Sequence, residues 1–256
     1  MKQLYILLLS SLLLCFACQW HLRSSDASDN KGRITIERYD RLERHFLMSG
    51  DVAALQQMNT EYPVQTRTLI EDVLRIGRVD EPDINIRFLS FFQDSTLQAL
   101  MSDVEQQYVS MSDVEQELTD AFHRLSSMIP TLATPRVYTQ IGSLDQSIVV
   151  GDGFLGISLD KYLGMDHPVY LRYGYTGKQR AMMKREYIAP DCLSFYLLSL
   201  YPFSDGPQAD VHMAKIQYVV NKALGKKIFL SEKVKAVEKQ MAKQPQTPID
   251  KLLSTN

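Results

Sequence analysis

Three glycines, Gly151, Gly153 and Gly156, have a spacing that could support nucleotide chemistry. The spacing matches a dinucleotide-binding fingerprint, in which a helix begins directly after the glycines and its amide groups bind a pyrophosphate. Here the residues that follow, Ile157 to Asp160, alternate in polarity as a strand does. Apolar residues on both sides of the pair Asp152-Gly153 instead predict a β-hairpin at about 147–159 and no nucleotide ligand.

Histidine, serine and cysteine offer few catalytic arrangements. No two of the five histidines lie four residues apart, so the helical histidine pair of a zinc site is missing. Ser158 does not fit a nucleophile elbow, because Asp160 stands where a glycine is required. Cys192 follows a predicted helix start, which could lower its pKa, but a buried structural thiol is the simpler interpretation. Asp160, Asp166 and Asp191 could act as acids, although Asp160 and Asp191 are also placed to cap helices.

The N-terminal residues are typical of a targeting signal. The apolar run from Leu4 to Leu14 is too short to span a bilayer but suits a signal peptide. It ends at Cys15-Phe-Ala-Cys18, which resembles the lipobox of bacterial lipoproteins, with cysteine where leucine is usual. The resemblance implies a signal peptide over residues 1–17 and a lipid anchor, including palmitate, on Cys18. An ordinary secretory signal is the alternative.

The residues after Cys18 bear on localisation. Residues 18–32 are mostly polar and are expected to form a lipid-anchored flexible tether. Gln19 follows the cysteine, so the aspartate that retains some lipoproteins in the inner membrane is absent. We therefore expect a protein of the cell envelope, anchored in the outer membrane through Cys18.

Length and composition favour a globular chain. It has 256 residues, of which 45% are hydrophobic, and a net charge of −2. This charge gives no electrostatic case for nucleic acid as a partner. Cys192 is the single cysteine beyond the leader, so no disulfide framework is expected.

The periodicity of apolar residues predicts an α+β fold, a mostly helical single domain around a short central sheet. Residues 33–39 alternate in polarity and predict an edge strand. Helices follow, one of them with a capping box at Ser112 and Glu115. A strand near 137–141 and the hairpin precede three more helices. We assign the α+β domain to residues 33–243 and a loose C-terminal tail to residues 244–256.

Two short segments, taken together with the lipobox and the order of elements, carry a family resemblance. They are Gly156-Ile-Ser-Leu-Asp-Lys-Tyr-Leu-Gly164 and Tyr187-Ile-Ala-Pro-Asp191, and Lys222-Ala-Leu-Gly225-Lys226 is a weaker third. The chain resembles the gliding motility lipoprotein GldB family of Bacteroidota over about residues 33–235. The family-segment residues, which we expect to border a possible cleft, are Asp160, Tyr162, Gly164, Tyr187 and Asp191.

That family in turn is similar to zinc peptidases of the zincin type, which implies a zincin-like architecture. The helix at 190–201 stands where a zincin carries H-E-x-x-H, yet it reads Asp191-Cys-Leu-Ser-Phe-Tyr196. Leu224 occupies the place of a third, acidic ligand. A site without both histidines cannot hold zinc tetrahedrally. We therefore expect a degenerate scaffold with no metal and no cofactor, and not an enzyme.

The resemblance implies a non-enzymatic accessory factor of gliding motility and its linked secretion machinery. Its expected partners are the membrane, through the lipid on Cys18, and an envelope protein. Two alternatives stay open. One is a peptide- or protein-binding envelope module that adds a strand to an exposed sheet edge. The other is a hydrolase that uses Cys192 or an unrecognised pair of carboxylates.

Overall fold

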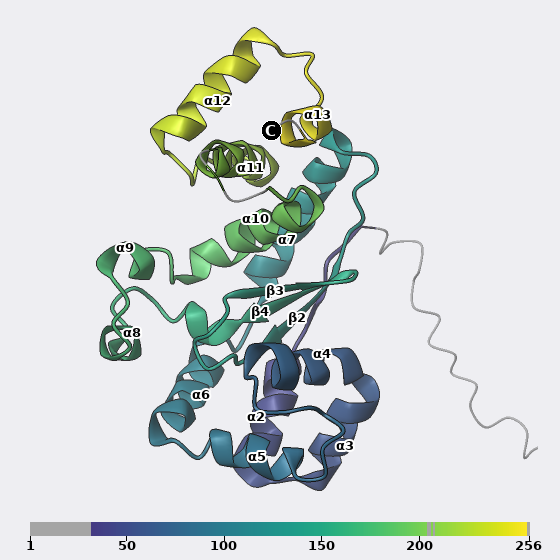
Figure 1. Ribbon diagram of the computed structural model, residues 1–256, viewed down its shortest axis with the longest axis vertical. Coiled ribbons are helices and arrows are strands. Elements are labelled where there is room, and N and C mark those ends of the chain that lie inside the picture. Colours follow the sequence, from purple (N-terminus) through teal and green to yellow (C-terminus); the bar gives the residue numbers. More distant parts are fainter. Residues whose placement is uncertain (1–31, 204–205, 207, 255–256) are drawn as a thin grey trace, which may run out of the picture. The chain divides into compact units, whose positions relative to one another are not determined.

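The computed structural model describes residues 32–203, 206 and 208–254 (Figure 1). The described residues all belong to one compact unit, Gly32–Asn256. The expected signal peptide, Cys18 and nearly all of the tether lie outside the described residues.

A mixed four-stranded sheet lies at the centre of this unit. Its strands are β1 (Ile36–Glu37), β2 (Arg136–Gln140), β3 (Ile148–Gly151) and β4 (Phe154–Ser158). They are ordered β1-β2-β4-β3, with β1, β2 and β4 parallel and β3 antiparallel to β4. The register that pairs Gln140 with Ser158 brings the carboxyl ends of β2 and β4 to the same edge.

The predicted hairpin is confirmed, and its glycines have steric roles. β3 and β4 pair with Val149 opposite Gly156. Gly153, in the turn, has a φ of 73°, a conformation that side chains disfavour. A Cβ atom on Gly156 would lie 2.5 Å from the hydroxyl oxygen of Tyr138 on β2, so only glycine fits there. These glycines therefore shape the sheet.

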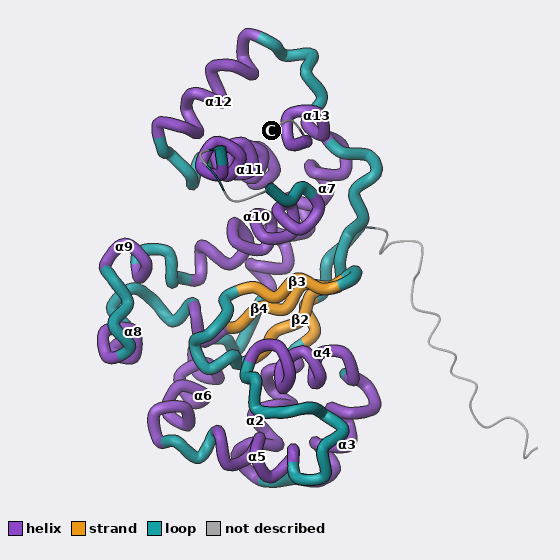
Figure 2. Tube along the Cα trace, in the orientation of Figure 1, coloured by secondary structure: helices purple, strands orange, loops and turns teal. Residues whose placement is uncertain are grey.

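Six helical segments connect β1 to the longest helix before the sheet continues. They are α2 (Tyr39–Ser49), α3 (Val52–Glu61), α4 (Pro63–Arg67), the π-helix η2 (Thr68–Val73), α5 (Ile84–Phe91) and α6 (Ser95–Gln107), and α7 (Ser112–Met128) follows. Side-chain caps begin two of them: Asp51 accepts from Ala53 N–H, and Asp94 accepts from Thr96 and Leu97 N–H. α2 packs against β2, so these segments cover one face of the sheet (Figure 2).

The helices that follow the hairpin build the other side of the domain. They are the 3₁₀ turn η3 (Leu159–Lys161), α8 (Pro168–Arg172), α9 (Gly177–Arg180), η4 (Arg185–Tyr187), α10 (Ile188–Leu200), α11 (Ala209–Leu224), α12 (Glu232–Lys243) and α13 (Ile249–Ser254). α10 packs against β3, β4 and α7, and α11 packs against α7, α10, α12 and α13. The mostly helical α+β fold predicted from the sequence is confirmed.

The edge strand β1 is shorter than predicted, and α7 covers its outer side. Glu115 Oε1 accepts a hydrogen bond from Ile36 N–H at 2.8 Å, and Thr119 Oγ1 accepts one from Ile34 N–H at 3.0 Å. The capping box predicted at Ser112 is therefore wrong, since α7 has no side-chain cap and its Glu115 is used by the sheet. Backbone groups that would attract a further strand are already bound here.

The C-terminal residues are not the loose tail that we predicted. Residues 249–254 form α13, and Leu252 and Leu253 are 5% and 1% exposed. The two leucines pack into the core beside α11. Burial of two leucine side chains stabilises the segment, and this long-range contact has no signal in the local sequence pattern. No helix in the described ranges has the length and apolar character needed to cross a membrane.

Replacing Leu253 by alanine tests whether α13 is part of the folded domain. We expect Leu253→Ala to lower the free energy of unfolding by about 2–5 kcal/mol, because it removes buried methyl groups and leaves a cavity. The matched control is Leu230→Ala, since Leu230 is 60% exposed. It should change stability by less than about 0.5 kcal/mol in urea denaturation. Equal losses for the two variants would contradict the docking of α13.

Candidate functional site

Three buried acidic side chains gather at the carboxyl edge of the parallel strands. Asp40 lies three residues after β1, Glu43 lies on α2, and Asp160 lies two residues after β4. None is more than 3% exposed. In sheets with parallel strands this edge is the usual place for ligands, so these residues define the first candidate site.

The acids bind the β2–β3 loop (residues 141–147) and the strand end before it. Asp40 accepts from the hydroxyl of Thr139, and Glu43 Oε2 accepts from Ile141 N–H at 2.9 Å. The carboxylate of Asp160 accepts from two amides of the loop, at 2.8 Å from Gly142 N and 2.6 Å from Leu144 N. The carboxyl groups therefore fix a loop and do not face solvent.

The β2–β3 loop is held in a strained conformation beside a hollow of about 340 Å³. In the described part of the chain, three residues other than glycine have positive φ: Arg75 (54°), Ser143 (50°) and Leu144 (67°). All three line this hollow, together with Asp145, Tyr173 and Tyr175. Strained backbone persists only where the surrounding structure over-determines it, and such strain concentrates at functional sites.

A second set of hydrogen bonds, from Lys161 and Tyr175, holds the same loop. Lys161 Nζ donates to the carbonyl of Leu144 at 3.1 Å and to the hydroxyl of Tyr175 at 2.9 Å. The hydroxyl of Tyr175 also donates to the carbonyl of Leu144, at 2.7 Å. The residues Asp160 and Lys161 of the family segment thus hold both the amide and the carbonyl of Leu144.

Burial decides the ionisation of the acids. It raises the pKa of Glu43 well above its usual value, against the hydrogen bond from Ile141, and the nearby Asp40 and Asp160 raise it further. Burial also raises the pKa of Asp160, against the amide hydrogen bonds from Gly142 and Leu144. A carboxyl group that is buried and hydrogen-bonded to backbone cannot reach a substrate, so these groups serve the structure.

The two segments that carried the family resemblance meet in the folded chain. Gly164 N–H donates to Met183 O at 2.9 Å, and Leu163 forms a β-bridge with Lys184. The hydroxyl of Tyr162 donates to Asp191 Oδ2 at 2.8 Å. The carbonyl of Tyr162 accepts from the hydroxyl of Tyr108 at 2.6 Å.

The predicted site residues therefore separate into two places. Asp160 binds the β2–β3 loop, Tyr162 and Asp191 form a partly buried pair, and Gly164 lies at the bridge. Tyr187 is half-buried, and its ring lies under the amine of Lys184, 5.6 Å from the ring centroid. None of these five residues lines the hollow beside the β2–β3 loop, and their place at a cleft stays a prediction.

Neither Asp160 nor Asp191 caps a helix, which corrects the sequence interpretation. η3 has Ser158 before it with no side-chain cap, and α10 begins at Ile188 with no side-chain cap. Asp191 is the fourth residue of α10. Its carboxyl group is partly buried, and this burial raises its pKa from 3.8 to about 7, opposed by the hydrogen bond from Tyr162.

Cys192 is a core residue, as its simpler interpretation predicted. It is fully buried on α10, and burial raises the pKa of its thiol well above the usual value, with a further contribution from Asp191. A thiol of this kind does not form the reactive thiolate. Among the residues that the structure describes, no group of three or more His, Cys, Asp and Glu is placed to hold a metal ion.

The acids of α2 were not predicted from the sequence. Tyr39, Glu43, Phe46 and Leu47 all lie on the buried face of this helix. Their spacing of four, seven and eight residues is that of a core stripe, so a glutamate within it was a usable signal of a buried polar contact.

The raised pKa of Asp191 predicts how stability depends on pH. Folding favours the protonated carboxyl, so its contribution to stability is full below about pH 4 and is lost as pH rises to about 7. Asp191→Asn keeps an acceptor for Tyr162 and cannot ionise. Relative to wild type, it should therefore gain about 2 kcal/mol of stability between pH 4 and pH 8, measured by urea denaturation.

The control for this experiment is Asp120→Asn, an exposed aspartate on α7. Its difference from wild type should be the same at pH 4 and pH 8. A difference for Asp191→Asn that is likewise independent of pH would contradict the buried Tyr162–Asp191 pair.

Comparison with known proteins bears directly on the family resemblance. A family model described as gliding motility protein GldB matches residues 22–252. The match covers the sheet, the β2–β3 loop and every helix up to the first turn of α13. No curated protein and no solved structure matches the chain. The name of the family model suggests a lipoprotein of the cell envelope. The chain belongs to the gliding motility protein GldB family.

Proposed function

We propose that this chain is a lipid-anchored accessory factor of gliding motility and its linked secretion machinery, and that it acts by binding and not by catalysis. The observation that carries the proposal is the family match over residues 22–252. We place the anchor on Cys18 and in the outer membrane, on the basis of the lipobox and of Gln19 after it.

The use of the titratable side chains supports a role without catalysis. Asp40, Glu43 and Asp160 are buried and bind a neighbouring hydroxyl or backbone amides. Asp191 accepts from Tyr162, and Cys192 is buried with a raised pKa. A general acid or nucleophile needs access to its substrate, and these groups lack it. The hydrolase based on Cys192 is therefore the weaker alternative.

We also propose that the scaffold is a zincin-like one from which the zinc ligands have been lost. α10 packs against the hairpin strands, and α11 packs against α10, which is the order of elements that the resemblance implies. Asp191 and Cys192 occupy α10 where the metal-binding motif would stand. In this proposal the chain keeps the zincin-like placement of α10 and α11 beside the hairpin strands but lacks the metal ligands.

The surface that we assign to the envelope partner is the hollow beside the β2–β3 loop. Buried acids and Lys161 hold this loop, so its backbone loses little conformational entropy when a partner binds. Two tyrosines and the pair Arg75–Asp145, with 3.7 Å between Nη2 and Oδ2, line it. Tyr173 is 51% exposed, and exposed aromatic residues are typical of binding surfaces.

Strand addition at an exposed sheet edge beside the hairpin is the alternative binding mode, and the structure restricts it at the β1 edge of the sheet. Glu115 and Thr119 of α7 already bind the amides along β1. At this edge of the sheet, an added peptide strand would have to displace them. We therefore favour the loop as the binding surface.

Labelling of cells with radioactive palmitate tests the lipid anchor. We expect label on the wild-type protein and none on Cys18→Ala, because the diacylglycerol of a lipoprotein is attached to that sulfur. Cys15→Ala is the matched control in the same segment and should keep the label. Label that persists in Cys18→Ala would refute the anchor and favour an ordinary secretory signal.

Co-purification from envelope extracts tests the partner surface. We expect a protein to be recovered with the wild type, and Tyr173→Ser to reduce its recovery by about tenfold, because loss of an interface aromatic commonly costs more than 1 kcal/mol. Phe195→Ser, at a 41% exposed aromatic residue on α10, should leave recovery unchanged. Equal recovery with both variants would exclude this surface.

A further inference from the structure

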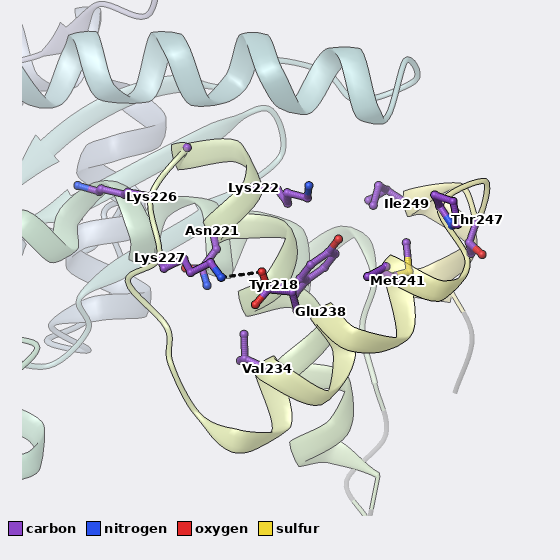
Figure 3. Close-up of a pocket in the computed structure, with 13 residues that line it drawn as sticks. Tyr218, Asn221, Lys222, Lys226, Lys227, Val234, Glu238, Met241, Thr247 and Ile249 are labelled. Carbon is purple, nitrogen blue, oxygen red and sulfur yellow. Dashed lines mark ion pairs between the residues drawn. The ribbon is translucent and has the colours of Figure 1, made fainter.

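The three C-terminal helices, α11, α12 and α13, enclose a cavity. It has a volume of about 710 Å³ and is lined by residues of α11, α12, α13 and the segments that join them (Figure 3). Pockets for small ligands in proteins have volumes of about 300–1,000 Å³. The segment once expected to be a loose tail supplies part of its wall, through Thr247 and Ile249.

One side of the cavity is apolar. Aliphatic side chains form this side together with the ring of Tyr218, and they are Val234, Met241, Ala242, Pro245 and Ile249. Val234 and Met241 are 3% and 7% exposed. In Figure 3, Met241 and Ile249 both lie to the right of the Tyr218 ring. A hydrocarbon chain placed here would leave water for apolar surroundings, which stabilises its binding.

The hydroxyl of Tyr218 is an unused hydrogen-bond donor in this cavity. Tyr218 is 8% exposed, yet its hydroxyl forms no hydrogen bond with any residue in the described ranges. Figure 3 shows that it points into the space between Lys222 and Ile249. Burial, and to a lesser extent Glu238, raises the pKa of Tyr218, so the hydroxyl keeps its proton. The hydroxyl is not sealed inside the protein, so it is free to donate to an acceptor group of a ligand in the cavity.

The polar side of the cavity is basic. Lys222, Lys226 and Lys227 line it, against a single acid, Glu238. Lys227 Nζ pairs with Glu238 at 2.7 Å, and Lys226 Nζ pairs with Glu117 of α7. Lys222 forms no ion pair within the described part of the chain. Its ammonium and the hydroxyl of Tyr218 are therefore two donors available to one anionic group.

We propose that this cavity binds an amphipathic anion, a molecule with one hydrocarbon chain that ends in a carboxylate or phosphate. The head group accepts hydrogen bonds from Tyr218 and Lys222. The chain lies along Met241, Ile249 and Val234. Fatty acids and the anionic ends of lipids share this chemistry.

Isothermal titration calorimetry tests the proposal. The protein lacks residues 1–17 and carries Cys18→Ser, so that no acyl chain is attached. The probes are laurate, dodecyl phosphate and dodecyltrimethylammonium, each below its micelle concentration. We expect one molecule of laurate or dodecyl phosphate to bind per chain, and the cationic probe to bind at least about tenfold more weakly. The preferred anion then distinguishes a carboxylate from a phosphate head group.

Variants locate the site. Lys222→Gln and Tyr218→Phe should each weaken laurate binding by about fivefold, because each removes one partner of the head group. Met241→Trp should weaken it by about tenfold or more, because the indole fills the space of the chain. Lys239→Gln, at an exposed lysine of α12 that does not line the cavity, should bind as the wild type does.

Melting curves show whether each variant is folded before its affinity is compared. The proposal is overturned if neither anion binds, if dodecyltrimethylammonium binds as tightly as laurate, or if the folded Lys222→Gln and Met241→Trp proteins keep the wild-type affinity.

Discussion

The β2–β3 loop is fixed by buried carboxyl groups, and the centre of the domain depends on this constraint. Glu43 on α2 and Asp160 on η3 bind amides of the loop, and Asp40 binds Thr139 on the strand end before it. A buried backbone amide without a partner is costly, and the hydrogen bonds that these carboxyl groups accept remove that cost. A change at Asp160 therefore affects the loop, η3 and the strand ends together.

The parallel register explains why one aspartate can do this. Because Gln140 pairs with Ser158, the chain leaves β2 and β4 at the same edge, and Asp160 lies beside Gly142 and Leu144. The same turn continues to Tyr162, which binds Asp191 on α10. The segment Gly156–Gly164 thus links the β2–β3 loop with helix α10. Asp160 makes the contact with the loop, and Tyr162 makes the contact with the helix.

Turn and capping signals in the sequence predicted the features that depend on residues close together in the chain. The hairpin follows from the turn at Asp152-Gly153, and the start of α6 follows from Asp94. The roles of Asp160 and Glu115 were missed because their partners lie 16 to 79 residues away. The docking of α13 was missed for the same reason, since Leu253 gains its burial from distant core residues. Caps and turns are local, whereas a buried side chain's partner is set by the tertiary fold.

Polar atoms without a hydrogen-bond partner occur both at the centre of the domain and among its C-terminal helices, but they differ in their access to solvent. The hydroxyl of Tyr138 and Oε1 of Glu43 also lack partners among the described residues, but both atoms are sealed inside the protein. A sealed group can only cost stability, and no solute reaches it. The hydroxyl of Tyr218 differs because it opens onto a cavity with a basic rim. A polar atom can bind a ligand only if the ligand can reach it. The C-terminal cavity is therefore a better candidate site for small molecules than the sealed centre of the domain.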